Sequence, residues 1–199
     1  MKVLGIVCSP RKGGNTELLM QEALAVVREA GAETELVSVI GKKISPCDAC
    51  ASCRETGKCK INDDMQPIYQ QMEAADAIIL GTPVYFMNVS AQMKTIMDRT
   101  YMFLGKRDAK MREPGVRRLR DKVAGGIVVT RRVGAGQVKA LLSNFFLSHG
   151  MITANIGIGY GRDKGEVKQG AGGGAGRTAI EEAREVGNNV IRMLKMLGK

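Results

Sequence analysis

The chain has 199 residues, which suits a single domain with a full hydrophobic core. No apolar run approaches the roughly 20 residues of a membrane-spanning helix, so a membrane protein is not expected. The net charge of +10, from 30 basic and 20 acidic residues, favours anionic ligands or partners. The absence of Trp and the small number of Tyr and Phe argue against a binder of single-stranded nucleic acid.

The first predicted strand, residues 3–8, is too short an apolar run for a signal peptide, and a loop and a helix follow it without a cleavage site. We therefore expect a cytoplasmic protein, whose thiols stay reduced. The cysteine count of five is odd, which also argues against a full disulfide framework. Cys8 ends the first strand and is expected to be a buried thiol.

The loop SPRKGGNT, residues 9–16, joins this strand to a helix predicted over 16–30. A loop between the carboxyl end of a strand and a helix presents free backbone N–H groups where anions bind in α/β proteins. Hydroxyl, amide and cationic side chains surround two glycines that permit close approach. The alternative is an ordinary turn whose helix is capped by Asn15 or Thr16. We favour a site for a phosphate monoester, formed by Ser9, Arg11, Gly14, Asn15 and Thr16.

After a strand over 35–40, a loop over 46–62 contains CDACASCRETGKC, with cysteines spaced C-x2-C-x2-C-x5-C. Structural zinc sites usually take ligand pairs from separated segments, whereas this compact run is close to that of bacterial ferredoxins. There the fourth cysteine serves a second cluster, but this chain has no second cysteine group, and Gly57 lets the chain turn back. We favour one [4Fe–4S] cluster over a zinc ion or over cysteines that bind nothing. The ligands would be Cys47, Cys50, Cys53 and Cys59.

A helix over 64–75 and a strand over 77–81 lead to the loop TPVYFM and a helix over 88–103. Burial within the domain does not explain large flat and polarizable side chains on a loop that follows a strand. Such side chains suit the flanks of an aromatic ring system, or the contact with a partner subunit. The residues predicted to flank a ring are Pro83, Val84, Tyr85, Phe86 and Met87.

A basic segment follows over 105–122, with eight basic and three acidic residues. We interpret it as a surface for an acidic redox partner or a neighbouring subunit, and a solvated connecting segment is the alternative. A strand over 124–130 then ends in TRRVGAGQ, residues 130–137. Backbone N–H groups of this loop could close over the ring, and its candidate binding residues are Thr130, Arg131, Gly134 and Gln137.

The C-terminal part contains a helix over 135–149, a strand over 152–159, a glycine-rich loop over 157–177 and a helix over 177–197. The loop is too rich in glycine to hold regular structure and is expected to be mobile. His149, the only histidine, is expected to be a helix-end or core residue. Five apolar strands that alternate with helices predict one α/β domain over 1–199. Its fold would be a flavodoxin-like, doubly wound, five-stranded parallel sheet in the order 2-1-3-4-5, with the cysteine-rich loop inserted after strand 2.

SPRKGGNT, TPVYFMNVSAQMKTIMDRT and the cysteine run together resemble the iron–sulfur flavoproteins of anaerobic archaea and bacteria, which belong to the flavodoxin-like NAD(P)H-dependent FMN reductases. The resemblance covers about residues 1–155. It implies FMN, a [4Fe–4S] cluster, and dimers or tetramers with flavins at subunit interfaces. It also implies that the FMN phosphate is held by Ser9, Arg11, Asn15 and Thr16, and that residues 83–87 flank the isoalloxazine.

These observations predict an FMN-dependent oxidoreductase that passes electrons from a ferredoxin or NAD(P)H to a small oxidant or a redox partner. No catalytic side chain is expected, because FMN and the cluster carry the electrons. One alternative is an NAD(P)H-dependent FMN or quinone reductase without a cluster. The alternative from another class is a basic, zinc-containing nucleic-acid-binding module.

Overall fold

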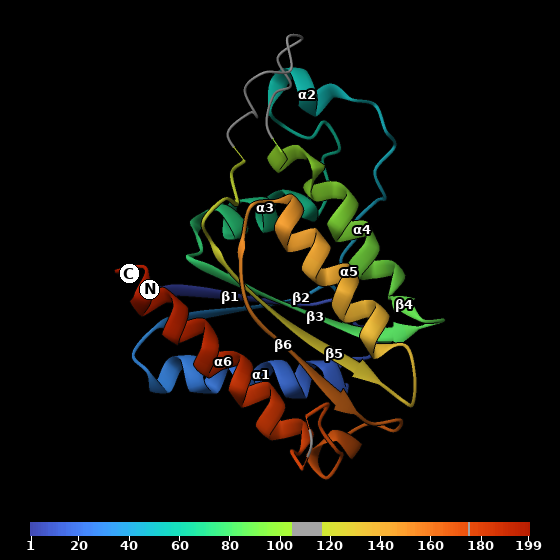
Figure 1. The fold of residues 1–199 in the computed structure, drawn as a ribbon. Coiled ribbons are helices and arrows are strands. Elements are labelled where there is room, and N and C mark those ends of the chain that lie inside the picture. The colour runs from blue at the N-terminus through green and yellow to red at the C-terminus, as the bar shows by residue number, and fades with distance from the viewer. Residues whose placement is uncertain (105–116, 175) are drawn as a thin grey trace.

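The computed structural model describes residues 1–104, 117–174 and 176–199, and its centre is a twisted parallel sheet (Figure 1). The strand order is β2-β1-β3-β5-β6, and a short strand β4 pairs antiparallel with β3. This order confirms the predicted flavodoxin-like topology once β4 is set aside. The strands are β1 (Lys2–Val7), β2 (Glu33–Ser38), β3 (Ala77–Tyr85), β4 (Asn88–Val89), β5 (Val123–Thr130) and β6 (Ile152–Tyr160).

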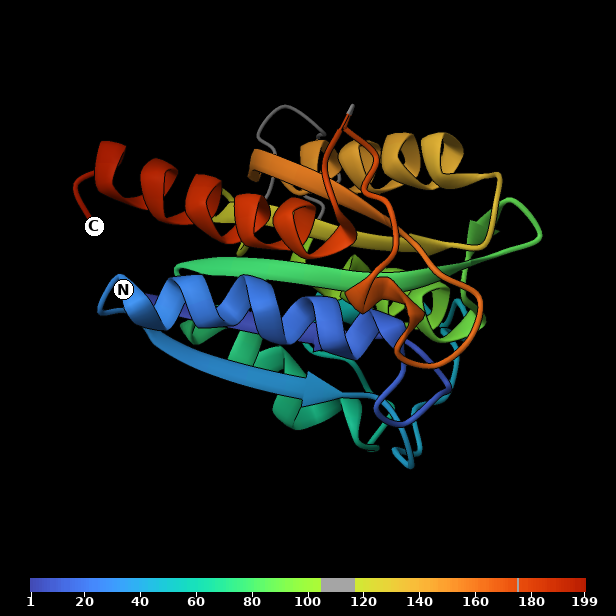
Figure 2. The same cartoon turned by 90° about the horizontal axis from the view of Figure 1, so that it is seen from below.

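Helices cover both faces of the sheet, which explains why the central strands are apolar at nearly every position. All eight residues of β5 are buried. Helices α1 and α6 pack together on one face, and α3, α4 and α5 cover the other (Figures 1 and 2). No helix within the described residues is long and apolar enough to cross a membrane. The helices are α1 (Asn15–Glu29), α2 (Ser52–Thr56), α3 (Met65–Ala74), α4 (Ala91–Arg99), α5 (Ala135–Ser148) and α6 (Ala179–Met196), with 3-10 turns η1 (Thr100–Leu104) and η2 (Glu166–Lys168).

Several predicted elements differ from the structure. The third strand, predicted over 77–81, continues as β3 to Tyr85, so residues 82–85 of the predicted loop belong to a strand. β2 begins two residues before the predicted start of 35, because its pairing with β1 begins at Glu33. The sheet has a sixth strand, β4, because residues 88–89 fold back and pair with β3. The helix predicted from 88 therefore begins only at Ala91. The short helix α2 lies inside the cysteine loop, where no helix was predicted.

The glycine-rich segment 157–177 is more regular than its composition suggested. β6 continues to Tyr160, η2 follows, and Gly159 and Ala171 form isolated β-bridges with Gly172 and Thr178. The glycines permit these close approaches, since a Cβ at Gly173 would lie 2.7 Å from Ile158 Cβ. The expectation that this segment lacks regular structure was therefore wrong.

The predicted basic segment lies only partly within the described residues, because 105–116 fall outside them. In the described part, Arg118 is engaged in the fold. It donates to the carboxylate of Glu73 at 2.8 Å and to the carbonyl oxygens of Gly57 and Met102 at 2.6 and 3.2 Å. Arg118 therefore supports the loop that carries the cysteines, rather than contributing a free charge to a surface patch.

His149 is buried at the end of α5, so acid should destabilise the fold through it. One ring nitrogen lies 3.1 Å from Thr100 Oγ1, while Nδ1 has no hydrogen-bond partner among the described residues. Burial first, and then the charge of Arg117, lower the pKa of His149 from 6.5 to about 4. The unfolded chain protonates this imidazole at a higher pH than the folded chain does. The free energy of unfolding should therefore fall by roughly 3 kcal/mol as the pH drops from 6.5 to 4.

Urea unfolding at a series of pH values tests this expectation. His149→Gln keeps a polar side chain but removes the titration, so its free energy of unfolding should depend much less on pH in that window. Equal pH dependence in the wild type and the variant would contradict a neutral, buried His149.

Candidate functional site

A cavity of about 450 Å³ lies at the carboxyl edge of the sheet, where β1, β3, β5 and β6 end. It collects residues that are more than 120 positions apart in the sequence, because parallel strands bring their carboxyl ends to one edge. Ten of the fourteen residues predicted to bind a cofactor line it: Ser9, Arg11, Gly14, Asn15, Thr16, Pro83, Val84, Tyr85, Thr130 and Arg131.

The β1–α1 loop presents the N-terminus of α1 to this cavity. Gly14 is the N-cap residue, and no side chain accepts a hydrogen bond from the first turn, so the cap predicted at Asn15 or Thr16 was wrong. Glu17 Oε2 accepts from the N–H of Gly13 at 2.8 Å, whereas Asn15 and Thr16 supply the first N–H groups of the helix, which have no intrahelical partner. The positive end of the helix dipole therefore faces the cavity.

The β3–β4 hairpin forms a projecting edge beside the cavity. Its two turn residues, Phe86 and Met87, have φ of 49° and 63°, a left-handed conformation that is unusual for large side chains. The side chain of Phe86 is fully exposed at the tip. Phe86 and Met87 line a second groove together with Arg131 and Val133, and this groove shares Val84, Thr130 and Arg131 with the first cavity.

Two contacts fix the hairpin to the sheet. Ser90 Oγ donates to the carbonyl of Cys8 at 2.6 Å and also caps α4 by accepting from the N–H of Met93, so the hairpin is tied to the end of β1. Gly134, with φ of 90°, packs directly beneath the turn, and a Cβ there would lie 2.9 Å from Met87 Cα. Gly134 thus serves the site by packing and does not line the cavity.

Gln137 is exposed on the first turn of α5 and lines neither of these hollows. The structure therefore does not bring it to the ring site where it was predicted. Thr130 does line the cavity, but its hydroxyl donates to the carbonyl of Val133 at 2.8 Å, which holds the turn after β5.

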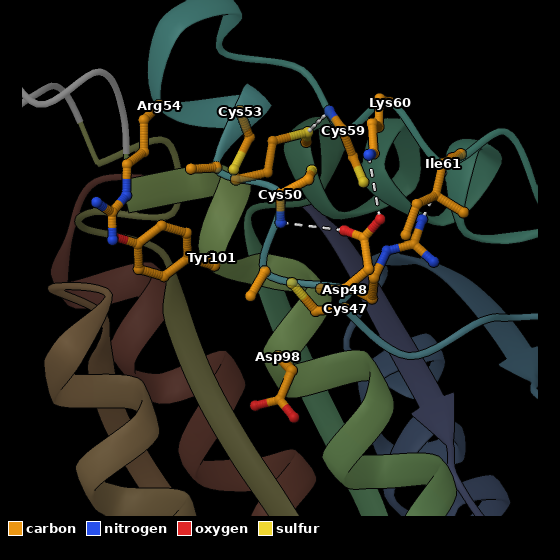
Figure 3. A pocket seen from close by; sticks show the side chains of 14 residues that line it. Cys47, Asp48, Cys50, Cys53, Arg54, Cys59, Lys60, Ile61, Asp98 and Tyr101 are labelled. Atoms are coloured by element: carbon orange, nitrogen blue, oxygen red, sulfur yellow. Dashed lines mark hydrogen bonds and ion pairs between the residues drawn. The ribbon is translucent and has the colours of Figure 1, made fainter.

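The four cysteines of the run 47–59 line a separate cavity of about 350 Å³ above the C-terminal end of α4 (Figure 3). The chain winds around it through residues with positive φ at Ala49, Ala51 and Gly57. Partial burial raises the pKa of the Cys53 thiol, and the neighbouring thiols of Cys59, Cys47 and Cys50 raise it further. Cys53 therefore lies close enough to the other three thiols to be affected by their charge. Cys8 is fully buried in the core, where burial raises the pKa of its thiol, and it lies outside this group.

A buried arginine holds both ends of the cysteine loop. The side chain of Arg99 is fully buried and donates to both carboxylate oxygens of Asp63, at 2.7 and 3.0 Å. It also donates to the carbonyl oxygens of Ser45 and Ile61, at 2.8 and 3.3 Å. Since Ser45 precedes the cysteine run and Ile61 and Asp63 follow it, Arg99 closes the base of the loop.

Smaller contacts order the interior of the cysteine loop. Asp48 accepts from the N–H of Cys50 at 3.2 Å and pairs with Lys60 at 3.2 Å (Figure 3). Met102 Sδ accepts from the N–H of Cys59 at 3.1 Å. The backbone at Cys50 and Cys59 is thus held by groups from the loop itself and from η1.

Residues 1–160 match the NADPH-dependent FMN reductases. The chain belongs to that family. An iron–sulfur flavoprotein of Methanocaldococcus jannaschii is 41% identical, and the alignment covers all of both chains. The iron–sulfur flavoprotein of Methanosarcina thermophila is 38% identical over 81% of each chain. The resemblance noted from the sequence is thereby confirmed, and the protein is an FMN-dependent oxidoreductase.

Solved structures support the fold of this chain. RosB with bound 8-demethyl-8-formylriboflavin-5'-phosphate superimposes with a TM-score of 0.75, at 19% identity, over all of this chain and 80% of its own. An NAD(P)H:quinone oxidoreductase from Methanothermobacter marburgensis gives a TM-score of 0.72, at 15% identity, over 96% of this chain and 98% of its own. At these identities the likeness shows the fold alone.

Sequence reasoning missed two features of this protein. Arg99 was not recognised, although it lies three positions after Ile96 and six after Met93, on the apolar face of α4. The other feature is the segment 161–164, which lines the first cavity. The signal for it was available, because the segment follows β6, whose carboxyl end lies at the same edge as those of β1, β3 and β5.

Proposed function

We propose that the protein is an electron-transfer flavoprotein that binds FMN in the cavity at the carboxyl edge and a [4Fe–4S] cluster in the cysteine cavity. It would pass electrons from a ferredoxin or NAD(P)H to a small oxidant or another redox protein. The observation that carries the proposal is that four cysteines of one loop line a single cavity, while the predicted phosphate and ring residues line another.

The residues of the first cavity fit FMN. The N-terminus of α1, with Ser9, Arg11 and Thr16 beside it, offers N–H, hydroxyl and guanidinium donors to a phosphate. Val84 and Tyr85 supply an apolar and an aromatic wall for the isoalloxazine. Phe86 and Met87, in the adjoining groove, extend that wall outwards.

The residues of the second cavity fit a cluster better than a single ion. Among the described residues, no three His, Cys, Asp or Glu side chains come close enough to hold one metal ion, yet all four cysteines line one hollow. Cys47, Cys50, Cys53 and Cys59 would each bind one iron of a [4Fe–4S] cluster. When bound, the cluster supplies one-electron transfer and FMN supplies two-electron chemistry.

The chain keeps the two sites apart. The two cavities share no lining residue, and α4, nine residues long, runs from the hairpin to Arg99 beside the cysteines. Its length is about 13 Å at 1.5 Å per residue.

The exposed Tyr85, Phe86 and Met87 give the hairpin an apolar surface suited to a second copy of the chain. A homodimer or homotetramer, located in the reducing cytoplasm, is part of the proposal.

The absorption spectrum of anaerobically purified protein tests the function. We expect two visible flavin bands on a broad iron–sulfur absorption, with about four irons and one FMN per chain. Flavin bands without iron would favour a cluster-free FMN or quinone reductase. A colourless protein with one zinc per chain would favour a nucleic-acid-binding module and overturn the proposal.

A further inference from the structure

The segment 161–165, which immediately follows the residues that match the FMN reductase family, forms one wall of the first cavity. Gly161, Arg162, Asp163 and Lys164 all line it. Gly161 begins the segment by donating its N–H to the carbonyl of Thr130 at 3.0 Å, which continues the sheet edge beyond β6. The glycine-rich region thus reaches the cavity at a defined place.

Three hydrogen bonds tie this segment to the β1–α1 loop. The Asn15 amide donates to the carbonyl of Asp163 at 2.9 Å and accepts from the N–H of Gly165 at 2.8 Å. Arg11 Nη1 donates to the carbonyl of Arg162 at 3.2 Å. Asn15 is only 9% exposed, and both halves of its amide are used, so it positions the segment against the start of α1.

This arrangement places the Lys164 ammonium over the loop that faces the cavity. Lys164 Nζ lies 3.2 Å from the point where a Cβ would stand at Gly13, whose φ of 59° suits glycine. Glu166 Oε2 accepts from the N–H groups of Arg162 and Asp163, at 2.6 and 2.8 Å. Because those N–H groups are already bonded, the segment offers the cavity its cationic side chains.

The charge of the cavity wall favours an anion. The lining includes four cationic side chains, of which the segment supplies Arg162 and Lys164, against the single carboxylate of Asp163. Arg11, which was predicted to bind a phosphate, is exposed and directed to the carbonyl of Arg162. The Lys164 ammonium beside Gly13 therefore adds a positive charge to a loop whose own Arg11 already donates to a carbonyl oxygen.

We propose that Lys164 is a ligand of the FMN phosphate and that Asn15 is the positioning residue that holds its segment in place. The proposal rests on the FMN site proposed above. In this proposal the glycine-rich region contacts the phosphate of FMN and not its isoalloxazine ring. It therefore predicts an effect on flavins that carry a phosphate and none on riboflavin, which lacks one.

Fluorescence titration of the flavin-free, full-length chain with FMN and with riboflavin tests this role. Lys164→Met should weaken FMN binding about tenfold, as expected for the loss of a charged hydrogen bond, and leave riboflavin binding unchanged. Lys168→Met is the matched control, because Lys168 is exposed in the same region but does not line the cavity, and it should change neither affinity.

A second pair of variants tests the positioning role. Asn15→Ala should also weaken FMN binding, and adding Lys164→Met to it should cause much less than a further tenfold loss, because the ammonium is already displaced. Full additivity would contradict the role of Asn15. An unchanged FMN affinity in Lys164→Met, or an equal loss for FMN and riboflavin, would overturn the role of Lys164.

Thr16→Ala separates this inference from the function on which it rests. Thr16 lines the same cavity and lies at the start of α1, and within the described residues no hydrogen bond joins it to the segment 161–165. If Thr16→Ala weakens FMN binding while Lys164→Met does not, only the role of Lys164 is wrong. If both variants bind FMN like the wild type, the FMN site itself is misplaced.

Discussion

Replacing any one of Cys47, Cys50, Cys53 and Cys59 with alanine is expected to remove iron and acid-labile sulfide while FMN stays bound. All four thiols line one cavity, so the loss of one leaves an iron without a protein thiolate. FMN should remain because the two cavities share no residue. Iron, sulfide and FMN contents of anaerobically purified variants provide the measurement.

Cys8→Ala is the matched control for these variants. Cys8 is fully buried at the end of β1 and lies outside the cysteine cavity, so iron and sulfide should stay at the wild-type level. The core would lose a small side chain and some stability. The cluster assignment is falsified if the wild type itself contains about one zinc and no labile sulfide per chain.

Arg99→Met is expected to cost 3–5 kcal/mol of the free energy of unfolding, roughly the penalty of breaking a buried ion pair. The variant leaves the Asp63 carboxylate, whose side chain is 10% exposed, without its bidentate partner. It also removes the Arg99 donors from the carbonyls of Ser45 and Ile61, of which Ile61 keeps a hydrogen bond from Gln66. Both ends of the cysteine loop lose their bonds to Arg99, so the iron content should fall as well, although the hydrogen bonds of Ser45 to Asp63 and of Lys43 to Asp64 still join them. Urea unfolding and metal analysis measure the two effects.

Lys94→Met controls for the loss of a positive charge on the same helix. Lys94 pairs with Asp98 at 2.7 Å, but both side chains are about half exposed, so its removal should cost at most about 1 kcal/mol. A loss in Arg99→Met no larger than in Lys94→Met would contradict the anchoring role of Arg99. Full iron content in Arg99→Met would show that Arg99 stabilises the fold but is not needed for cluster binding.

At acid pH, the free energies of unfolding of the wild type and of Arg99→Met should become more alike. Burial alone would raise the pKa of Asp63, but hydrogen bonds from Arg99 and from the N–H groups of Ser45 and Met65 lower it overall below 3.8. A carboxylate with a lowered pKa in the folded state stabilises the fold above its unfolded pKa and loses this effect as the pH falls through the folded value. The difference should therefore be largest above pH 4 and shrink at lower pH.

The sequence by itself determined the features that depend on neighbouring residues. Alternating apolar runs and helical periodicity predicted the sheet and its order, because strands buried on both faces must be apolar throughout. The spacing of the cysteines predicted one group of four thiols, because short separations confine the sulfur atoms to one loop. Residues 9–16 and 83–87 were placed at one edge, because parallel strands share a carboxyl edge.

Only the tertiary structure decided which distant segments support these sites. Asn15 was predicted as a phosphate ligand, with a helix cap as the alternative, yet its amide donates to a backbone carbonyl 148 residues away. Arg99 likewise reaches the carbonyl of a residue 54 positions before it. Gly134 was predicted to bind a ring, but it packs beneath Met87. Local propensity predicts that a side chain lies near a turn or on a buried helix face. Which polar group it meets there depends on how the loops pack after the sheet has formed, because a buried polar side chain must find a partner among whatever groups that packing brings to it.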